Sequence, residues 1–155
     1  MRMRGILAAV APPLAAAIAG SFGSRRAPQV YHRLAKPRWA PPSGAFGPVW
    51  TALYGLIGFA GWRMWQGRTP PRVWGLHAAQ LTLNAVWPFV FFSARDKRAS
   101  LAVIAALDAV LIGQIGDLAR RDAVAAAALG PYLGWTLFAT ALTASVSDPD
   151  RVAPG

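Results

Sequence analysis

Long apolar blocks separated by short polar connections form the pattern of this chain. Each block is close to the ~20 residues that an α-helix needs to cross the hydrocarbon core of a bilayer. The pattern therefore predicts an all-α integral membrane protein, a five-transmembrane-helix bundle in a single membrane domain. The predicted helices cover residues 5–22, 46–65, 73–92, 99–118 and 123–145, and residues 146–155 form a polar tail.

The first apolar block has a second interpretation. Arg2 and Arg4 precede it, and the small residues Ala19, Gly20 and Ser21 stand at its end. A cleaved signal peptide shows the same order of a basic start, an apolar stretch and small residues. The sequence leaves both interpretations open, a spanning helix and a signal peptide.

The third block, residues 73–92, carries polar side chains at helical spacing. Gln80, Asn84 and Trp87 share one face, because positions three and four residues apart stack along a helix. Amide side chains are costly in hydrocarbon unless they are paired, so this face predicts a protein-lined cavity that holds a ligand. The opposite face carries small residues, which allow close approach of another helix in a homodimer or within the bundle. These residues are Gly75, Ala78, Thr82 and Ala85.

Aromatic residues recur at helical spacing on two further blocks. Trp50 and Tyr54 share a face of the second block, and Trp135 and Phe138 lie one turn apart on the fifth. Such residues more often pack the core of a bundle than bind a ligand. Three helices that present tryptophan beside amide groups nevertheless favour a flat ligand, held by stacking and a few hydrogen bonds.

The connection over residues 23–45 is long and rich in Arg, Pro and Trp. Three prolines in residues 36–42 fix φ and favour extended geometry around Trp39. We expect this stiff segment to lie across the mouth of the bundle as a lid, with Trp39 pointing inward. An equally good interpretation places Trp39 in an aromatic belt at the membrane interface.

Composition supports the membrane interpretation. Hydrophobic residues make up 55% of the 155 positions and charged residues 14%, where a soluble domain carries about 25% charge. The net charge of +10 would suit nucleic acid, but the basic residues lie mainly in the connections, where they meet lipid phosphates. No zinc-finger or RNA-binding pattern accompanies them. We therefore expect the lipid bilayer as a partner and no nucleic acid.

Catalysis has little support, because the chain has no cysteine, two histidines and six acidic residues. No nucleophile–base pair or metal-ligand spacing stands out, so we expect no catalytic residue, no metal and no obligatory cofactor. Asp108 lies in the middle of the fourth block, where an ionised carboxylate costs about 2.5–3.5 kcal/mol. A protonated state or a partner such as Thr136, Thr140 or an indole is expected for it, and a proton- or ligand-linked role is the alternative.

Several segments together resemble the translocator protein family, whose bacterial members are called tryptophan-rich sensory proteins. The resemblance extends in order and spacing over nearly the whole chain, from about Pro12 to Leu142. The segments that carry it are Trp39 with its flanking prolines, residues 49–54 (VWTALY), 80–87 (QLTLNAVW), 91–92 (FF) and 131–135 (PYLGW).

The resemblance implies a commonly dimeric five-helix bundle whose first loop closes a pocket for tetrapyrroles, protoporphyrin IX or haem. It implies a membrane receptor or sensor that regulates porphyrin or oxidative-stress responses, with ligand transport or light-driven, tryptophan-dependent porphyrin breakdown as further activities to consider. Together with the polar and aromatic helix faces described above, the resemblance predicts the following pocket residues: Trp39, Trp50, Tyr54, Gln80, Asn84, Trp87, Phe91, Trp135, Phe138, Ala139 and Leu142.

The chain departs from the family pattern after Leu142, where animal members carry a sterol-recognition segment. Neither the Tyr nor the basic residue of that segment follows here, which makes sterol binding doubtful. The alternative function is a small-molecule transporter with a polar path at Gln80, Asn84 and Asp108, although the sequence shows no internal repeat of the transporter kind. The many Ala, Gly and Arg residues suggest a bacterium with a GC-rich genome, and a helical bundle favours its cytoplasmic membrane over the outer one.

Overall fold

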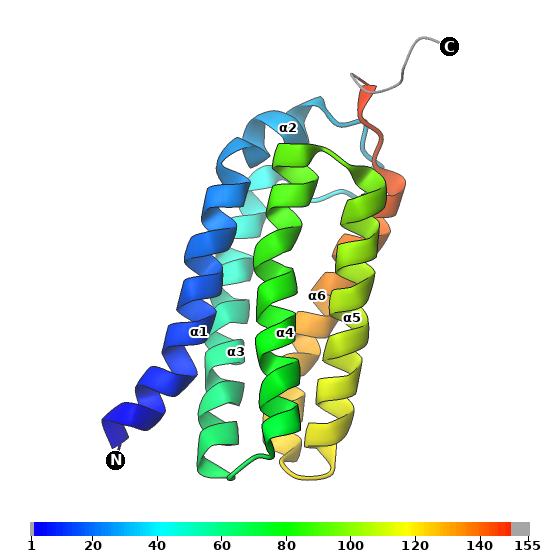
Figure 1. Ribbon diagram of the computed structural model, residues 1–155. Coiled ribbons are helices and arrows are strands. Elements are labelled where there is room, and N and C mark those ends of the chain that lie inside the picture. Colours follow the sequence, from blue (N-terminus) through cyan, green and yellow to red (C-terminus); the bar gives the residue numbers. More distant parts are fainter. Residues whose placement is uncertain (1, 150–155) are drawn as a thin grey trace.

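The computed structural model describes residues 2–149 of the chain. Within this range, long helices stand side by side as one bundle, and the short helix α2 (Ala27–Arg33) lies across one end (Figure 1). The long helices are α1 (Arg2–Gly23), α3 (Phe46–Gln66), α4 (Pro71–Pro88), α5 (Lys97–Ala119) and α6 (Ala123–Ser145).

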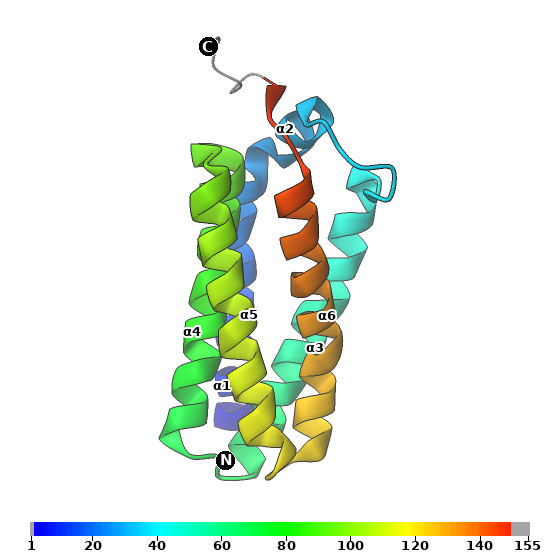
Figure 2. The ribbon, with the colours of Figure 1, turned by 90° about the vertical axis from the view of Figure 1, so that its right-hand side faces the viewer.

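The helices form a ring that does not follow chain order. α1 packs against α3 and α4, α6 packs against α3 and α5, and α4 packs against α5. Figure 2 shows the same arrangement after a quarter turn, with the end of α6 close to the segment that follows α2. Because the ring closes on itself, side chains from all five long helices share one interior.

The predicted all-α bundle is confirmed, but the predicted loop at residues 23–45 is partly helical. The 3-10 turn η1 (Ser24–Arg26) continues directly from α1 and leads into α2, and η2 (Ser43–Ala45) precedes α3. Pro28 lies in the first turn of α2, where its missing N–H removes no helical hydrogen bond. We call residues 24–45 the cover segment.

The third predicted span also differs from the structure. Its α-helix ends at Pro88, and residues Phe89–Ala94 continue as a π-helical turn, η3. A proline inside a helix removes one backbone donor and disturbs the regular hydrogen-bond ladder. By length and apolar composition, the described residues hold three candidate membrane spans, Gly5–Arg33, α5 and α6. α3 and α4 are not among these candidates, and α4 carries His77, Gln80 and Asn84, all buried in the interior.

The outer surface of the bundle is apolar. α1 exposes Ile6, Leu14 and Ile18 on the face turned away from its neighbours, and α5 exposes Ile112. An exposed apolar surface of this kind is what lipid-facing helices present. The small-residue face of α4 is also turned outward. Its members Gly75, Ala78 and Thr82 are exposed and Ala85 is half-buried, so this face is not buried within the bundle, and the homodimer stays a prediction.

α1 and α3 approach closely where α1 carries two adjacent prolines. Pro13 has no N–H to donate to the carbonyl of Ala9, one turn earlier. That carbonyl oxygen faces Gly58 and Gly61 of α3, at 3.8 and 3.5 Å from where their Cβ atoms would stand. The two glycines therefore let the backbones of α1 and α3 meet beside the freed carbonyl.

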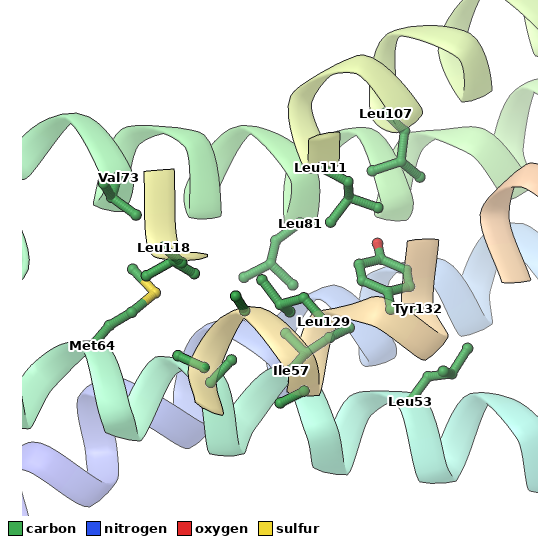
Figure 3. Packing of buried hydrophobic residues seen from close by; sticks show 14 of the residues in the cluster. Leu53, Ile57, Met64, Val73, Leu81, Leu107, Leu111, Leu118, Leu129 and Tyr132 are labelled. Atoms are coloured by element: carbon green, nitrogen blue, oxygen red, sulfur yellow. The ribbon is translucent and has the colours of Figure 1, made fainter. Parts of the chain in front are cut away.

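The half of the bundle away from α2 has a dense apolar core, seen from close by in Figure 3. Ile57, Leu111 and Leu129 come from α3, α5 and α6 and are completely buried there. Between membrane helices such packing acts mainly through van der Waals contact, because lipid tails are as apolar as the core. This half of the bundle is thus closely packed and fixes the helices relative to one another.

The predicted polar tail, residues 146–155, begins inside the fold. Val146 is buried in a second apolar cluster with Tyr31, Leu34 and Leu142. Ser147 and Ala35 exchange two backbone hydrogen bonds, 2.9 and 3.1 Å long. These contacts attach the cover segment to the end of α6. Residues 150–155 of the predicted tail lie outside the described residues.

Asp122 fixes the turn between α5 and α6 at the far end of the bundle. Its Oδ1 accepts the N–H groups of Val124 and Ala125, both at 3.1 Å, and so caps α6. The Arg63 guanidinium pairs with the same carboxylate at 3.0 Å. The hydrogen bond from Arg63, followed by that from the Ala125 amide, holds the pKa of the Asp122 carboxyl below its usual value.

The low pKa of Asp122 predicts a pH dependence of stability. The pair contributes fully above the ordinary carboxyl pKa of about 4, and its contribution is lost as the pH falls through the lower pKa of the folded state. We expect Asp122→Asn to melt at a lower temperature than the wild type at pH 6, with the difference shrinking as the pH falls below about 4. Thermal unfolding followed by circular dichroism in detergent measures this. Arg121→Gln, an exposed change in the same turn, serves as control; a pH-independent difference would contradict the prediction.

Candidate functional site

A cavity of about 350 Å³ lies inside the bundle, in the half next to α2. Its volume is near the lower end of the range for small-molecule pockets, about 300–1,000 Å³. All five long helices and the cover segment contribute to its wall. We call it the aromatic cavity, because of the following wall residues: Tyr31, Phe46, Trp50, Tyr54, Trp87, Phe91, Phe92 and Trp135.

The aromatic rings of the wall support one another. Trp87 stacks on Phe91, one turn later, with ring centroids 4.8 Å apart and planes 12° apart. Phe46 meets Trp135 edge to face at 5.8 Å between the centroids, and Trp50 lies 5.7 Å from Tyr54. Rings held in this way offer flat, rigid surfaces to a ligand at little cost in conformational entropy.

Asn84 organises the polar part of the wall. The Tyr54 hydroxyl donates to its Oδ1 at 2.6 Å, and its Nδ2 donates to the Tyr132 hydroxyl at 2.8 Å. One amide thus joins α3, α4 and α6 through two hydrogen bonds. Tyr132 is completely buried beneath the cavity, so this network also fixes the position of the wall.

Trp87 supplies a donor that the protein does not use. Its indole Nε1 is buried and has no hydrogen-bond partner among the described residues. Buried N–H groups are rarely left unpaired, and each exception calls for an explanation such as a water molecule or a ligand. Trp87 is also one of the wall residues of the aromatic cavity, so this unpaired donor lies next to the space that a ligand would fill.

The sequence model of the TspO/MBR family matches residues 8–147, nearly the whole chain. The chain belongs to the TspO/MBR family. It is 36% identical to the tryptophan-rich protein TspO of Archaeoglobus fulgidus, over 94% of this chain and 97% of that protein. It is 35% identical to the translocator protein of Homo sapiens, over 86% and 82% of the two chains. The tryptophan-rich sensory protein of Cereibacter sphaeroides is 33% identical, over 72% and 71%.

Membership of the TspO/MBR family confirms the resemblance seen in the sequence. It also makes the bundle an integral membrane protein, in agreement with its apolar outer surface. Most of the predicted site residues lie on the wall of one cavity in this family member. Those on the wall are Trp50, Tyr54, Asn84, Trp87, Phe91, Trp135, Ala139 and Leu142.

Three predicted residues lie off the wall of the cavity. Trp39 is 50% exposed and does not line the cavity; it stands in a turn in which the Ala40 N–H donates to the Pro37 carbonyl at 3.0 Å. Phe138 packs between Trp39 and Trp135, at 5.6 and 5.3 Å between centroids, and so lies behind the wall. The expectation that Trp39 points into the pocket is therefore wrong for this structure.

Gln80 is the third of these residues. It is completely buried one turn of α4 before Asn84, with its Nε2 3.3 Å from His77 Nδ1. The Gln114 Nε2 lies 3.0 Å from the same ring nitrogen. These groups form a polar cluster below the cavity. Among the residues that the structure describes, no group of three His, Cys, Asp or Glu residues is placed to hold a metal.

Asp108 is buried, and its predicted partner on a neighbouring helix is found. Thr140 Oγ1 lies 2.7 Å from Asp108 Oδ2 and 2.9 Å from the Thr136 carbonyl oxygen. Asp108 Oδ1 has no partner in the described structure. Asp108, Asn84 and Gln80, the residues of the predicted transport path, belong to three different hydrogen-bonded groups rather than to one row.

Sequence reasoning missed the contribution of α1 and α2 to the wall. Gly20 and Ser21 line the cavity, as does Tyr31 of α2. The Tyr31 hydroxyl donates to the Pro41 carbonyl at 2.7 Å, which fixes the ring against the cover segment. The small residues at the end of the first block were a usable signal, but they also fitted a signal-peptide cleavage site.

Proposed function

We propose that this TspO/MBR-family protein is a membrane receptor or sensor that binds a tetrapyrrole, such as protoporphyrin IX or haem, in the aromatic cavity. Through that ligand it regulates porphyrin or oxidative-stress responses. The names of its relatives, tryptophan-rich sensory protein and translocator protein, support the general kind of function.

The observation that carries the proposal is the position of Trp50, Trp87 and Trp135 around one cavity, together with the unpartnered N–H of Trp87. A conjugated macrocycle is flat and polarisable, and indole rings stack on such surfaces. The ring nitrogens and peripheral groups of the macrocycle can form hydrogen bonds with the few polar groups of the wall. The cavity, about 350 Å³ in volume, is within the size range of small-molecule pockets.

Titration with protoporphyrin IX tests the proposal. Purified protein in detergent is titrated while the porphyrin absorption band is followed, for the wild type, Trp87→Phe and Trp135→Phe. We expect saturable, stoichiometric binding by the wild type and a Kd about three to ten times higher for each variant, because phenylalanine stacks less well and lacks the indole N–H. Trp62→Phe is the matched control, since Trp62 lies outside the cavity wall and is partly exposed.

Two outcomes would contradict tetrapyrrole binding in this cavity. The first is a signal that never saturates, which means partitioning into the micelle. The second is an equal loss of affinity in Trp62→Phe and Trp87→Phe. If binding is saturable, uptake into proteoliposomes then separates a receptor from the alternative transporter, in which the change Asp108→Asn would reduce uptake.

We further propose that the protein works as a homodimer in the bacterial cytoplasmic membrane. The exposed face of Gly75, Ala78 and Thr82 on α4 supports the homodimer, because small residues allow two helix backbones to approach. The helical bundle with an apolar outer surface supports the cytoplasmic rather than the outer membrane, whose spanning proteins are typically β-barrels.

A further inference from the structure

A hollow of about 520 Å³ lies at the end of the bundle away from the aromatic cavity. It is formed by two turns, one between α3 and α4 and one between α5 and α6, which lie at the same end of the bundle (Figure 1). We call it the basic groove. Its charged lining residues are Arg63, Arg68, Arg121 and Asp122.

The basic groove keeps an excess of positive charge. The Arg63 guanidinium donates from Nε and Nη2 to the two carboxylate oxygens of Asp122, both at 3.0 Å, so these two charges compensate each other. Arg68 and Arg121 are exposed, and the side chain of neither forms a hydrogen bond or an ion pair with another residue in the described part of the chain. Their two guanidinium groups are therefore available to an anion that enters between the turns.

Arg68 occupies a backbone position that folding alone would assign to glycine. Its φ is 50°, in the left-handed region that non-glycine residues seldom adopt. It comes directly after the C-cap of α3, and the Thr69 N–H donates to the Met64 carbonyl at 3.2 Å, as in a Schellman turn. Glycine is the usual left-handed residue of this turn, because a side chain makes the conformation costly. An arginine that is held there beside a hollow indicates a binding role.

The basic groove lies at the level where the spanning helices meet the lipid headgroups. Trp62 and Trp65, near the end of α3, are 36% and 47% exposed, and tryptophan is enriched at the membrane–water interface. Val124, which lines the groove, is 51% exposed and adds apolar surface beside the arginines. An occupant with an anionic head and apolar chains fits this combination.

We propose that the basic groove binds the phosphate of an anionic phospholipid, whose acyl chains lie along the apolar outer surface of the bundle. Arg68 and Arg121 donate to the phosphate oxygens, because the planar guanidinium matches their geometry. The Thr69 hydroxyl lines the same groove and supplies a further donor. Basic pockets at the ends of membrane helices suit anionic headgroups for these reasons. The groove is separate from the aromatic cavity, so the proposal does not depend on tetrapyrrole binding.

Melting temperatures in mixed micelles test the proposal. The wild type, Arg68→Gly, Arg121→Gln and the control Arg120→Gln are unfolded in a maltoside detergent with phosphatidylglycerol, with phosphatidylcholine or with no lipid. Phosphatidylglycerol should raise the melting temperature of the wild type and of Arg120→Gln more than phosphatidylcholine does. From the dependence on lipid concentration, we expect an apparent Kd for phosphatidylglycerol about ten times higher in Arg68→Gly and in Arg121→Gln. Arg120 is an exposed neighbour outside the groove, so the control removes the same charge.

Arg68→Gly also separates a binding role from a structural one. Without lipid it should melt at the same temperature as the wild type or higher, because glycine fits the left-handed position. A lower melting temperature without lipid, together with an unchanged response to phosphatidylglycerol, would make Arg68 a structural residue and overturn the proposal. The proposal also fails if Arg120→Gln loses the lipid response as fully as Arg121→Gln does, or if inorganic phosphate alone reproduces the shift.

Discussion

Replacing Asn84 with leucine is expected to lower the free energy of unfolding by about 2 kcal/mol. The change leaves the hydroxyl groups of Tyr54 and Tyr132 without their shared partner, and Tyr132 is too deeply buried to reach water. In a membrane the unfolded state also finds partners for polar groups, which limits the loss. Because the network positions the wall of the aromatic cavity, we expect weaker porphyrin binding in the same variant.

Unfolding in mixed micelles of mild detergent and dodecyl sulfate measures the change in stability. Thr51→Leu is the control, because Thr51 is exposed on α3 and its hydroxyl bonds to the Gly47 carbonyl of its own helix. A double-mutant cycle with Tyr54→Phe isolates the energy of one hydrogen bond. If Asn84→Leu and Thr51→Leu were equally stable, the network would not hold the helices together.

Replacing Gly23 with alanine is expected to destabilise the cavity end by about 1–3 kcal/mol. The new Cβ would stand 2.8 Å from the backbone nitrogen of Phe89 and 2.9 Å from its ring. A backbone atom cannot rotate away as a flexible side chain can, so α1 and η3 would have to separate. Since η3 supplies Phe91 and Phe92 to the cavity wall, porphyrin affinity should fall together with stability.

Gly134→Ala in α6 is the control, and we expect the opposite effect on stability from it. No atom lies within 4 Å of the position of its Cβ, and an alanine inside a helix is about 0.5–1 kcal/mol more favourable than a glycine. Thermal unfolding in detergent should therefore show a lower melting temperature for Gly23→Ala and an equal or higher one for Gly134→Ala. A stabilised Gly23→Ala would show that α1 and η3 are not in close contact.

The sequence predicted the helices and much of the cavity wall, because both depend on helical periodicity. Trp50 with Tyr54, and Asn84 with Trp87, share faces that any α-helix would give them. Helical periodicity does not predict at which level of the bundle a helix face lines a cavity. Gln80 lies on the same face of α4 as Asn84. One turn further from the cavity, however, its side chain meets His77 instead of open space.

Other features depended on contacts between distant segments. Trp39 stands in a proline-rich turn, and its ring packs against Phe138 of α6, a residue 99 positions later in the chain, with centroids 5.6 Å apart. The sequence around Pro28 is typical of a loop, but proline is also common in the first turn of a helix. Only the position of this segment directly after α1 decides between a loop and a helix. The contribution of α1 followed from the order of helices around the ring, which a single sequence does not specify.

The pair of hydrogen bonds between Ala35 and Ser147 bears on how fast a ligand can enter and leave. The cover segment joins α1 at one end and α3 at the other, and this pair fastens its middle to the end of α6. It therefore cannot swing open as a flap on a single hinge. Opening of the cover segment requires these bonds to break or the end of α6 to move along with it. Such collective openings take place in microseconds to milliseconds, so a ligand that leaves past the cover would have its residence time set by the protein rather than by diffusion.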